Sequence, residues 1–217
     1  MDLLLPVPSA RATFFLAATT LIGALGLSPR ASNAAAPSAD SPPLAESSAA
    51  DAAHWQVLTD RAAKIVAALQ LDDAQLATRV RDEIARQYVA LGKLHDAGQV
   101  EPVALDALHR RFVARLAAQL TPLQVDQVKD GMTYGVVPIT LNGYQQMLPE
   151  LTEEQRHEIH AQLLEAREYA MDAGSSDAKH AVFGKYKGRI NNYLSRAGID
   201  LKQAEKEWAA RRQAAKK

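Results

Sequence analysis

The stretch Leu120-Thr121-Pro122-Leu123-Gln124 returns almost unchanged as Leu151-Thr152-Glu153-Glu154-Gln155. Two further copies carry aspartate in place of threonine: Leu71-Asp72-Asp73-Ala74-Gln75 and Ile199-Asp200-Leu201-Lys202-Gln203. The phrase is typical of a helix start, because Thr or Asp accepts a hydrogen bond from the third helical amide and Gln at that position reaches back to the cap. Pro122 fits the first helical position, where a missing N–H costs nothing. Four helices are therefore predicted to begin at residues 72, 121, 152 and 200.

Apolar residues elsewhere recur at three- and four-residue spacing, which is typical of amphipathic helices. The spacing predicts an all-α fold of about eight helices in a single domain over residues 54–215. Gly131 is expected just after the fourth helix, at the start of a connector over residues 131–138. The interval from residue 71 to 151 is close to that from 120 to 199, so a two-fold internal repeat is one alternative for this domain.

The N-terminal residues resemble a targeting segment rather than part of the fold. Arg11 precedes an apolar run over residues 14–27, which is shorter than the roughly 20 residues that span a bilayer. We therefore expect a signal peptide over residues 1–34, with an uncleaved membrane anchor as the alternative. Residues 35–53 are rich in Ala, Ser and Pro and predict a disordered linker. The mature protein is expected in the periplasm or outside a bacterium, with no stable membrane span.

Composition narrows the function further. The chain has no cysteine, which excludes disulfides, lipid attachment to cysteine and thiolate metal sites. Its net charge is zero, but residues 177–217 carry eleven Lys or Arg and four Asp or Glu. This basic end would face an anionic partner, or pair with the acidic remainder of the chain in the fold or across a homodimer. Export argues against nucleic acid as a partner.

The most suggestive chemistry lies in residues 184–191. Lys185 and Arg189 are four residues apart and share a helix face, as do Lys187 and Asn191. The glycines at 184 and 188 leave bare backbone beside them. Arg binds carboxylate, sulfate or phosphate groups bidentately and Asn bonds to hydroxyls, so these four residues predict a site for an acidic glycan. The alternative is that the glycines admit a neighbouring helix and the cations are solvated or ion-paired.

A second set of candidates would perform acid/base chemistry. Asp130 and Tyr134 would form such a pair if the connector folded against the Lys185 segment. His180 lies one turn inside a helix that Ser176 or Asp177 is able to cap, and capping is the simpler interpretation of those two residues. If Asp130, Tyr134 and His180 shared a pocket, the protein would be an enzyme acting on saccharides.

The chain predicts no metal site and no cofactor. His157 and His160 are three residues apart on one helix, but they lack the H-E-x-x-H spacing and any evident third ligand. A solvated polar helix face is the favoured interpretation.

Two resemblances to known families extend this prediction. The L-T-x-x-Q phrase at residues 120 and 151 resembles the repeated motif of the periplasmic Spy and CpxP chaperones, which implies a helical dimer that holds client proteins. Residues from about 55 to 212 resemble the exported bacterial family catalogued as domain of unknown function 3826. The segments that carry this resemblance are VKDGMTYG at 128–135, EYAMDAGSS at 168–176 and FGKYKGRINNYL at 183–194. It implies export and an α-helical domain, and it brings no established activity.

The sequence thus predicts an exported helical protein that binds an anionic ligand such as an acidic glycan, with a chaperone and a saccharide enzyme as alternatives. The decisive geometric question is whether residues 129–135 and 184–192 meet in one cleft.

Overall fold

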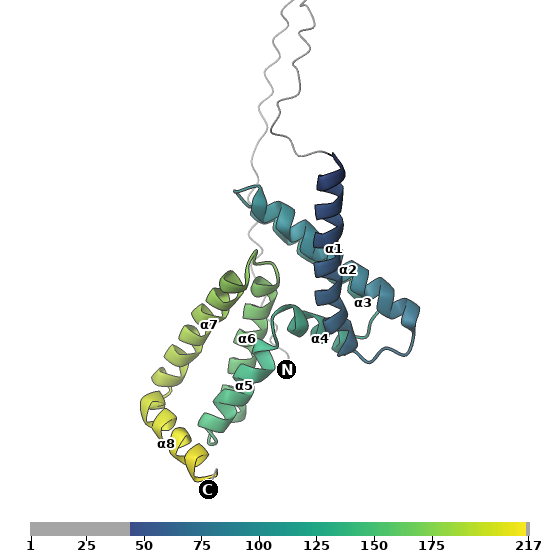
Figure 1. Ribbon diagram of the computed structural model, residues 1–217. Coiled ribbons are helices and arrows are strands. Elements are labelled where there is room, and N and C mark those ends of the chain that lie inside the picture. Colours follow the sequence, from purple (N-terminus) through teal and green to yellow (C-terminus); the bar gives the residue numbers. More distant parts are fainter. Residues whose placement is uncertain (1–43, 216–217) are drawn as a thin grey trace, which may run out of the picture. The chain divides into compact units, whose positions relative to one another are not determined.

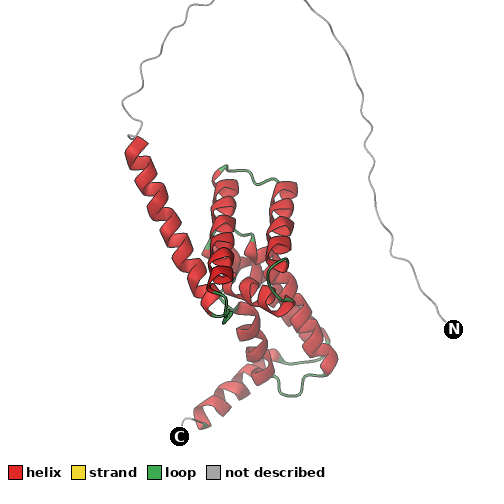
Figure 2. Ribbon diagram, turned by 90° about the vertical axis from the view of Figure 1, so that its right-hand side faces the viewer, coloured by secondary structure: helices red, strands yellow, loops and turns green. Residues whose placement is uncertain are grey.

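The computed structural model describes residues 44–215, and within them the chain forms eight α-helices and no β-strand (Figures 1 and 2). The helices are α1 (Leu44–Ala67), α2 (Ala74–Asp96), α3 (Pro102–Ala117), α4 (Pro122–Met132), α5 (Val136–Met147), α6 (Glu153–Met171), α7 (Ser176–Arg196) and α8 (Leu201–Ala214). The prediction of a single all-α domain is confirmed. The predicted signal peptide and residues 35–43 of the predicted linker lie outside the described residues.

The helical region begins earlier than the sequence predicted. Helix α1 starts at Leu44, so residues 44–53 are helical where a disordered linker was expected. Residues 49–54 are exposed, and burial therefore does not explain their helical conformation. Alanine has the highest intrinsic helix propensity, and residues 44–53 contain no Gly or Pro that would interrupt the helix. The linker was predicted from the absence of large apolar residues, and the helix propensity of its alanines was not taken into account.

The repeated phrase forms helix caps, in two versions. Thr121 and Thr152 each form a complete capping box, in which the threonine side chain and the glutamine three residues later bond to each other's backbone amides. Asp200 accepts a hydrogen bond from the Gln203 amide, without the reciprocal bond. The first copy is displaced by one residue, because Asp73 rather than Asp72 caps α2.

The core has two parts. The first lies among α1, α2, α3 and α4, where Ile84, Phe112 and Leu116 are fully buried. The second lies among α5, α6, α7 and α8, where α6 and α7 pack side by side around Ile159 and Phe183 (Figure 1). Helix α6 belongs to both, because its last residue, Met171, is buried in the first part. Helices α2, α3 and α4 lie in the first part, and α7 and α8 lie in the second. The two-fold internal repeat stays a prediction.

The end of α4 differs from the prediction. Gly131 lies inside the helix, which continues to Met132, and its Cα passes so close to α1 that a Cβ there would lie 2.7 Å from Ile65 Cγ2. Tyr134 takes the left-handed conformation that usually follows a helix, with a φ of 61°, and the Gly135 amide closes the turn onto the Asp130 carbonyl at 2.8 Å. Gly131 is needed inside α4 for close packing against α1, so it is not the residue that ends the helix. The left-handed position after the helix falls on Tyr134 instead.

In the described part of the chain, no helix is both long and apolar enough to cross a membrane.

Two glycine substitutions test this packing. Gly131→Ala should lower the free energy of unfolding by about 1–3 kcal/mol, because the new methyl group overlaps the buried Ile65 side chain. Gly184→Ala should raise it by up to about 1 kcal/mol, because a Cβ there meets no atom within 4 Å and Ala favours the helix. Urea unfolding followed by circular dichroism measures both. A destabilised Gly184→Ala protein would contradict the open surroundings of α7.

Candidate functional site

The two glycines of the basic helix face open space. Within residues 44–215, an added Cβ at Gly184 or Gly188 would meet no atom within 4 Å, so these glycines do not admit any of the eight helices closely. The backbone of α7 is therefore bare and accessible beside the predicted cations.

The four predicted anion-binding residues do not form one site. Lys185 and Arg189 lie on one side of α7 and Lys187 and Asn191 on another, because two residues along a helix correspond to a turn of about 200°. Arg189 is engaged within the fold: its guanidinium lies 4.6 Å from the centre of the Tyr186 ring and 3.7 Å from a Glu165 carboxylate oxygen. Lys185 is exposed.

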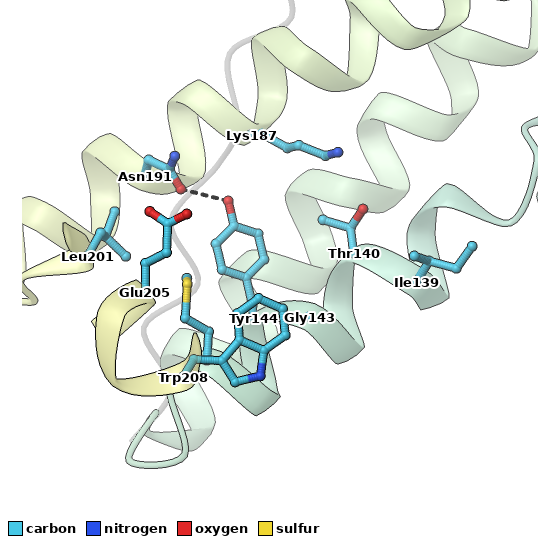
Figure 3. Close-up of a pocket in the computed structure, with 10 residues that line it drawn as sticks. Ile139, Thr140, Gly143, Tyr144, Lys187, Asn191, Leu201, Glu205 and Trp208 are labelled. Atoms are coloured by element: carbon cyan, nitrogen blue, oxygen red, sulfur yellow. Dashed lines mark hydrogen bonds between the residues drawn. The ribbon is translucent and has the colours of Figure 1, made fainter. Parts of the chain in front are cut away.

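Lys187 and Asn191 lie together in a groove of about 470 Å³, which we call the α5–α7–α8 groove (Figure 3). Helix α5 contributes one wall, α7 the second and α8 the third. The remaining lining residues are Ile139, Thr140, Gly143, Tyr144, Met147, Leu201, Glu205 and Trp208. The sequence had not indicated any of these eight residues as part of a site.

One hydrogen bond fixes the polar centre of this groove. The Tyr144 hydroxyl donates to Asn191 Oδ1 at 2.7 Å (Figure 3). Burial raises the pKa of Tyr144 to about 12, so the phenol keeps its proton and remains the donor. Because the amide oxygen is occupied, the amide nitrogen of Asn191 is left to donate to another group.

The groove also has an aromatic side and two charges. Trp208 is half-buried and lies beside Tyr144, and the Arg212 guanidinium lies 5.0 Å from the Trp208 ring centre. Lys187 and Glu205 lie on either side of the Tyr144 hydroxyl in the view of Figure 3. Among the side chains described, no carboxylate lies within 4.0 Å of the Lys187 ammonium. The arrangement is able to bind a ring through Trp208 and an anionic group through Lys187.

Asp130 and Tyr134 lie in a different cavity, of about 500 Å³, which we call the α1–α4 cleft. It is lined by Arg61, Lys64, Ile65, Ala68, Tyr88, Gln127, Asp130, Gly131, Tyr134 and Gly135. The 129–135 connector and the 184–192 face of α7 thus line separate cavities. His180 stacks on Tyr134 with ring centres 5.6 Å apart but does not line the cleft.

The acid/base interpretation of Asp130 loses its basis for a structural reason. Asp130 Oδ1 accepts a hydrogen bond from Arg167 at 2.9 Å, so this carboxylate serves an ion pair within the fold. The predicted set of Asp130, Tyr134 and His180 is not brought into a single pocket, as the enzyme alternative would require. The cap of α7 is Ser175, one residue before the predicted Ser176, and it accepts from the Ala178 amide at 3.1 Å.

An ionic junction around the buried Arg167 guanidinium, which the sequence did not reveal, connects α3, α4 and α6. The Arg167 guanidinium donates to Asp126 at 2.6 Å and to Asp130 at 2.9 Å. Next to it, the Lys129 ammonium donates to Glu168 at 2.7 Å. The only sequence signal was the density of charges within the segments 126–130 and 167–172.

His109 completes this junction. Its Nδ1 lies 2.8 Å from Asp172 Oδ2 and its Nε2 lies 3.4 Å from Glu168 Oε2. These hydrogen bonds, to Asp172 first and then to Glu168, raise the pKa of His109 to about 9. Burial alone would raise the pKa of Glu168, but the bonds from His109 and Lys129 outweigh it and lower that pKa to about 2. The imidazolium thus bridges two carboxylates.

Lys179 extends the polar interior at the start of α7. Its ammonium is buried and donates to the Ala170 and Met171 carbonyls, at 2.9 and 3.0 Å, which are the last carbonyls of α6. Burial lowers the pKa of Lys179 to about 8. This lysine was counted in the basic end of the sequence, yet the fold uses it to cap a helix.

His157 and His160 are exposed on α6, and within the described residues no group of three or more His, Asp or Glu side chains is arranged to hold a metal ion.

The protein is a small all-α domain whose α5–α7–α8 groove has charged and polar side chains and one aromatic wall. The chain belongs to the family described as "Protein of unknown function (DUF3826)", whose model matches residues 55–103 and 94–214. The match includes all three segments that carried the resemblance in the sequence. The similarity to the Spy and CpxP chaperones is not confirmed, and both copies of its motif act as capping boxes in this fold. No curated protein matches the chain.

His109 makes the stability of the fold depend on pH. A histidine whose pKa is raised in the folded state stabilises it fully below its unfolded pKa of about 6.5, and this stabilisation is lost as pH rises through about 9. His109→Gln should therefore cost about 1–2 kcal/mol near pH 6, a value reduced by partial solvent screening. The cost should shrink towards pH 9.5. Urea unfolding across this pH range measures the difference between the two proteins.

The control for that series is His160→Gln, which alters an exposed histidine on α6. The free energy of unfolding of His160→Gln should differ little from that of the parent protein, and this difference should not change with pH. A His109→Gln difference that was equally flat would show that the imidazolium bridge does not stabilise the fold.

Proposed function

We propose that this protein is an exported binding protein that holds an acidic sugar residue in the α5–α7–α8 groove. The observation that carries the proposal is the meeting of Lys187, Asn191 and Trp208 in one cavity of about 470 Å³. That volume lies within the usual range of small-molecule sites. The proposal retains two of the four residues that the sequence indicated for an anionic glycan, and it assigns Lys185 and Arg189 no contact with the sugar.

Each side chain has a chemical role towards a sugar acid. Lys187 supplies a positive charge without a carboxylate partner in the described structure, which suits the carboxylate of a uronate. The free amide N–H of Asn191 and the carboxylate of Glu205 suit ring hydroxyls, as donor and acceptor respectively. Trp208 offers an aromatic face for the apolar side of the ring, as aromatic residues do in many binding sites.

The charges favour a sugar acid over a simple anion. Glu205 brings a negative charge into the same groove, so a small dianion such as phosphate would meet both attraction and repulsion. A uronate carries its carboxylate on C5 and has hydroxyls at C2 and C3 on the opposite side of the ring. It is therefore able to place the carboxylate towards Lys187 and its hydroxyls towards Glu205.

We infer export from the N-terminal sequence. Arg11, the apolar run and the small residues that follow are typical of a signal peptide. An extracellular or periplasmic location would bring the protein into contact with acidic polysaccharides.

Calorimetric titration of the purified protein with tetragalacturonate, a hyaluronan tetrasaccharide and cellotetraose tests the proposal. We expect at least one of the two acidic tetrasaccharides to bind and the neutral cellotetraose not to bind. Trp208→Ala and Lys187→Gln should each weaken that binding about tenfold, or roughly 1.4 kcal/mol.

The matched control is Lys185→Gln, which removes the same charge from the same helix two residues away but outside the groove. Its affinity should equal that of the parent protein. Equal losses for Lys185→Gln and Lys187→Gln would indicate a diffuse charge effect and contradict a site in the groove, as would binding of cellotetraose as tight as that of the acidic probes.

A further inference from the structure

The α1–α4 cleft carries cations that the fold does not use. Arg61 and Lys64 are exposed and lie one turn apart on α1, both lining the cleft. Among the side chains described, no carboxylate lies within 4.0 Å of either. The one acid that lines the cleft, Asp130, is ion-paired with Arg167 and carries a single negative charge against the two cations. The cleft therefore has a positive charge that a bound anion would balance.

Aromatic rings stand beside these cations. The Arg61 guanidinium lies 5.4 Å from the ring centre of Tyr88, which orients the guanidinium along one wall. Tyr134 forms another part of the wall and is 47% exposed, so its ring is accessible to a ligand. Ile65 and Ala68 add an apolar surface. The cleft is therefore complementary to a ligand that has a ring and an anionic group: the cations suit the anionic group, and the aromatic and apolar surfaces suit the ring.

The conformation of Tyr134 has a cost that the packing of its own ring does not offset. Its φ of 61° costs a non-glycine residue about 1–2 kcal/mol. Burial of the ring does not offset this cost, since the ring remains half-exposed. The stacked His180 ring, with an interplanar angle of 15°, supports Tyr134 from α7 and holds it at the edge of the cleft. Residues held in such sparsely populated backbone conformations cluster at ligand sites.

We infer that the α1–α4 cleft is a second binding site, which takes the carboxylate of a sugar acid on Arg61 and Lys64 and its ring against Tyr134. Arg61 is suited to bidentate pairing with the carboxylate, and Lys64 adds a second charge one turn along α1. The site is built from α1, α2, α4 and the connector, so it shares no residue with the α5–α7–α8 groove. The inference therefore stands or fails independently of the groove.

Nuclear magnetic resonance of the His180 ring protons gives a readout local to this cleft, because the ring lies against Tyr134. Titration of the protein with tetragalacturonate or the hyaluronan tetrasaccharide should shift these resonances in a saturable manner. The shift should persist in Lys187→Gln, which disables only the groove. It should be lost in the double variant Arg61→Gln/Lys64→Gln, with at least a tenfold weaker affinity.

Two further variants secure the interpretation. Lys93→Gln removes an exposed cation from α2 outside the cleft and should leave the His180 shift unchanged. Tyr134→Asn removes the ring but keeps a residue that tolerates positive φ, so the protein should fold and bind at least tenfold more weakly in this cleft. Absence of any His180 shift with both acidic probes, or an unchanged affinity in Arg61→Gln/Lys64→Gln, would overturn the second site. Loss of groove binding alone would leave it intact.

Discussion

The rest of this structure depends on the ion pairs that the buried guanidinium of Arg167 forms with α4. The Arg167 side chain is only 5% exposed and it is held by two carboxylates of α4, those of Asp126 and Asp130. Removing one partner of a buried ion pair costs far more than the pair contributes, because a charge is then left without compensation. Since α6 contributes to both parts of the core and α4 to the first, this ionic contact sets how α6 is positioned against α4. The α1–α4 cleft includes residues of α4, and the α5–α7–α8 groove is lined by α5 and α7, which both pack against α6.

The glycines divide into two kinds with opposite consequences. Gly131 and Gly174 allow close approach: a Cβ on Gly174 would lie 2.6 Å from the His95 ring, whose Nε2 lies 2.7 Å from the Asp172 carbonyl oxygen. Gly184 and Gly188 face open space instead. The first pair is required by packing against Ile65 and His95. The second pair has no packing role, which leaves an uncovered stretch of backbone on the helix that supplies Lys187 and Asn191.

Local rules predicted most of the fold, because caps and apolar spacing are encoded within a few residues. The boxes at Thr121 and Thr152 lie where the repeated phrase placed them. The α5–α7–α8 groove was harder to predict, since it depends on which helix faces meet in the folded chain. Lys187 and Asn191 were found from their spacing, whereas Glu205 and Trp208 join them only because α8 folds back towards α5. The bridge from His109 to Asp172 spans 63 residues and has no counterpart in any local pattern.

The two tryptophans of this chain are divided between the two parts of the core. Trp55 packs against the first part from α1, and Trp208 lies in the groove beside the second. Indole emission changes with the polarity of its surroundings, so each part of the core has one tryptophan whose emission reports on it. Single-tryptophan versions would therefore report separately on the loosening of each part of the core during denaturation, and coincident curves would mean that the ionic junction makes the domain unfold as one cooperative unit.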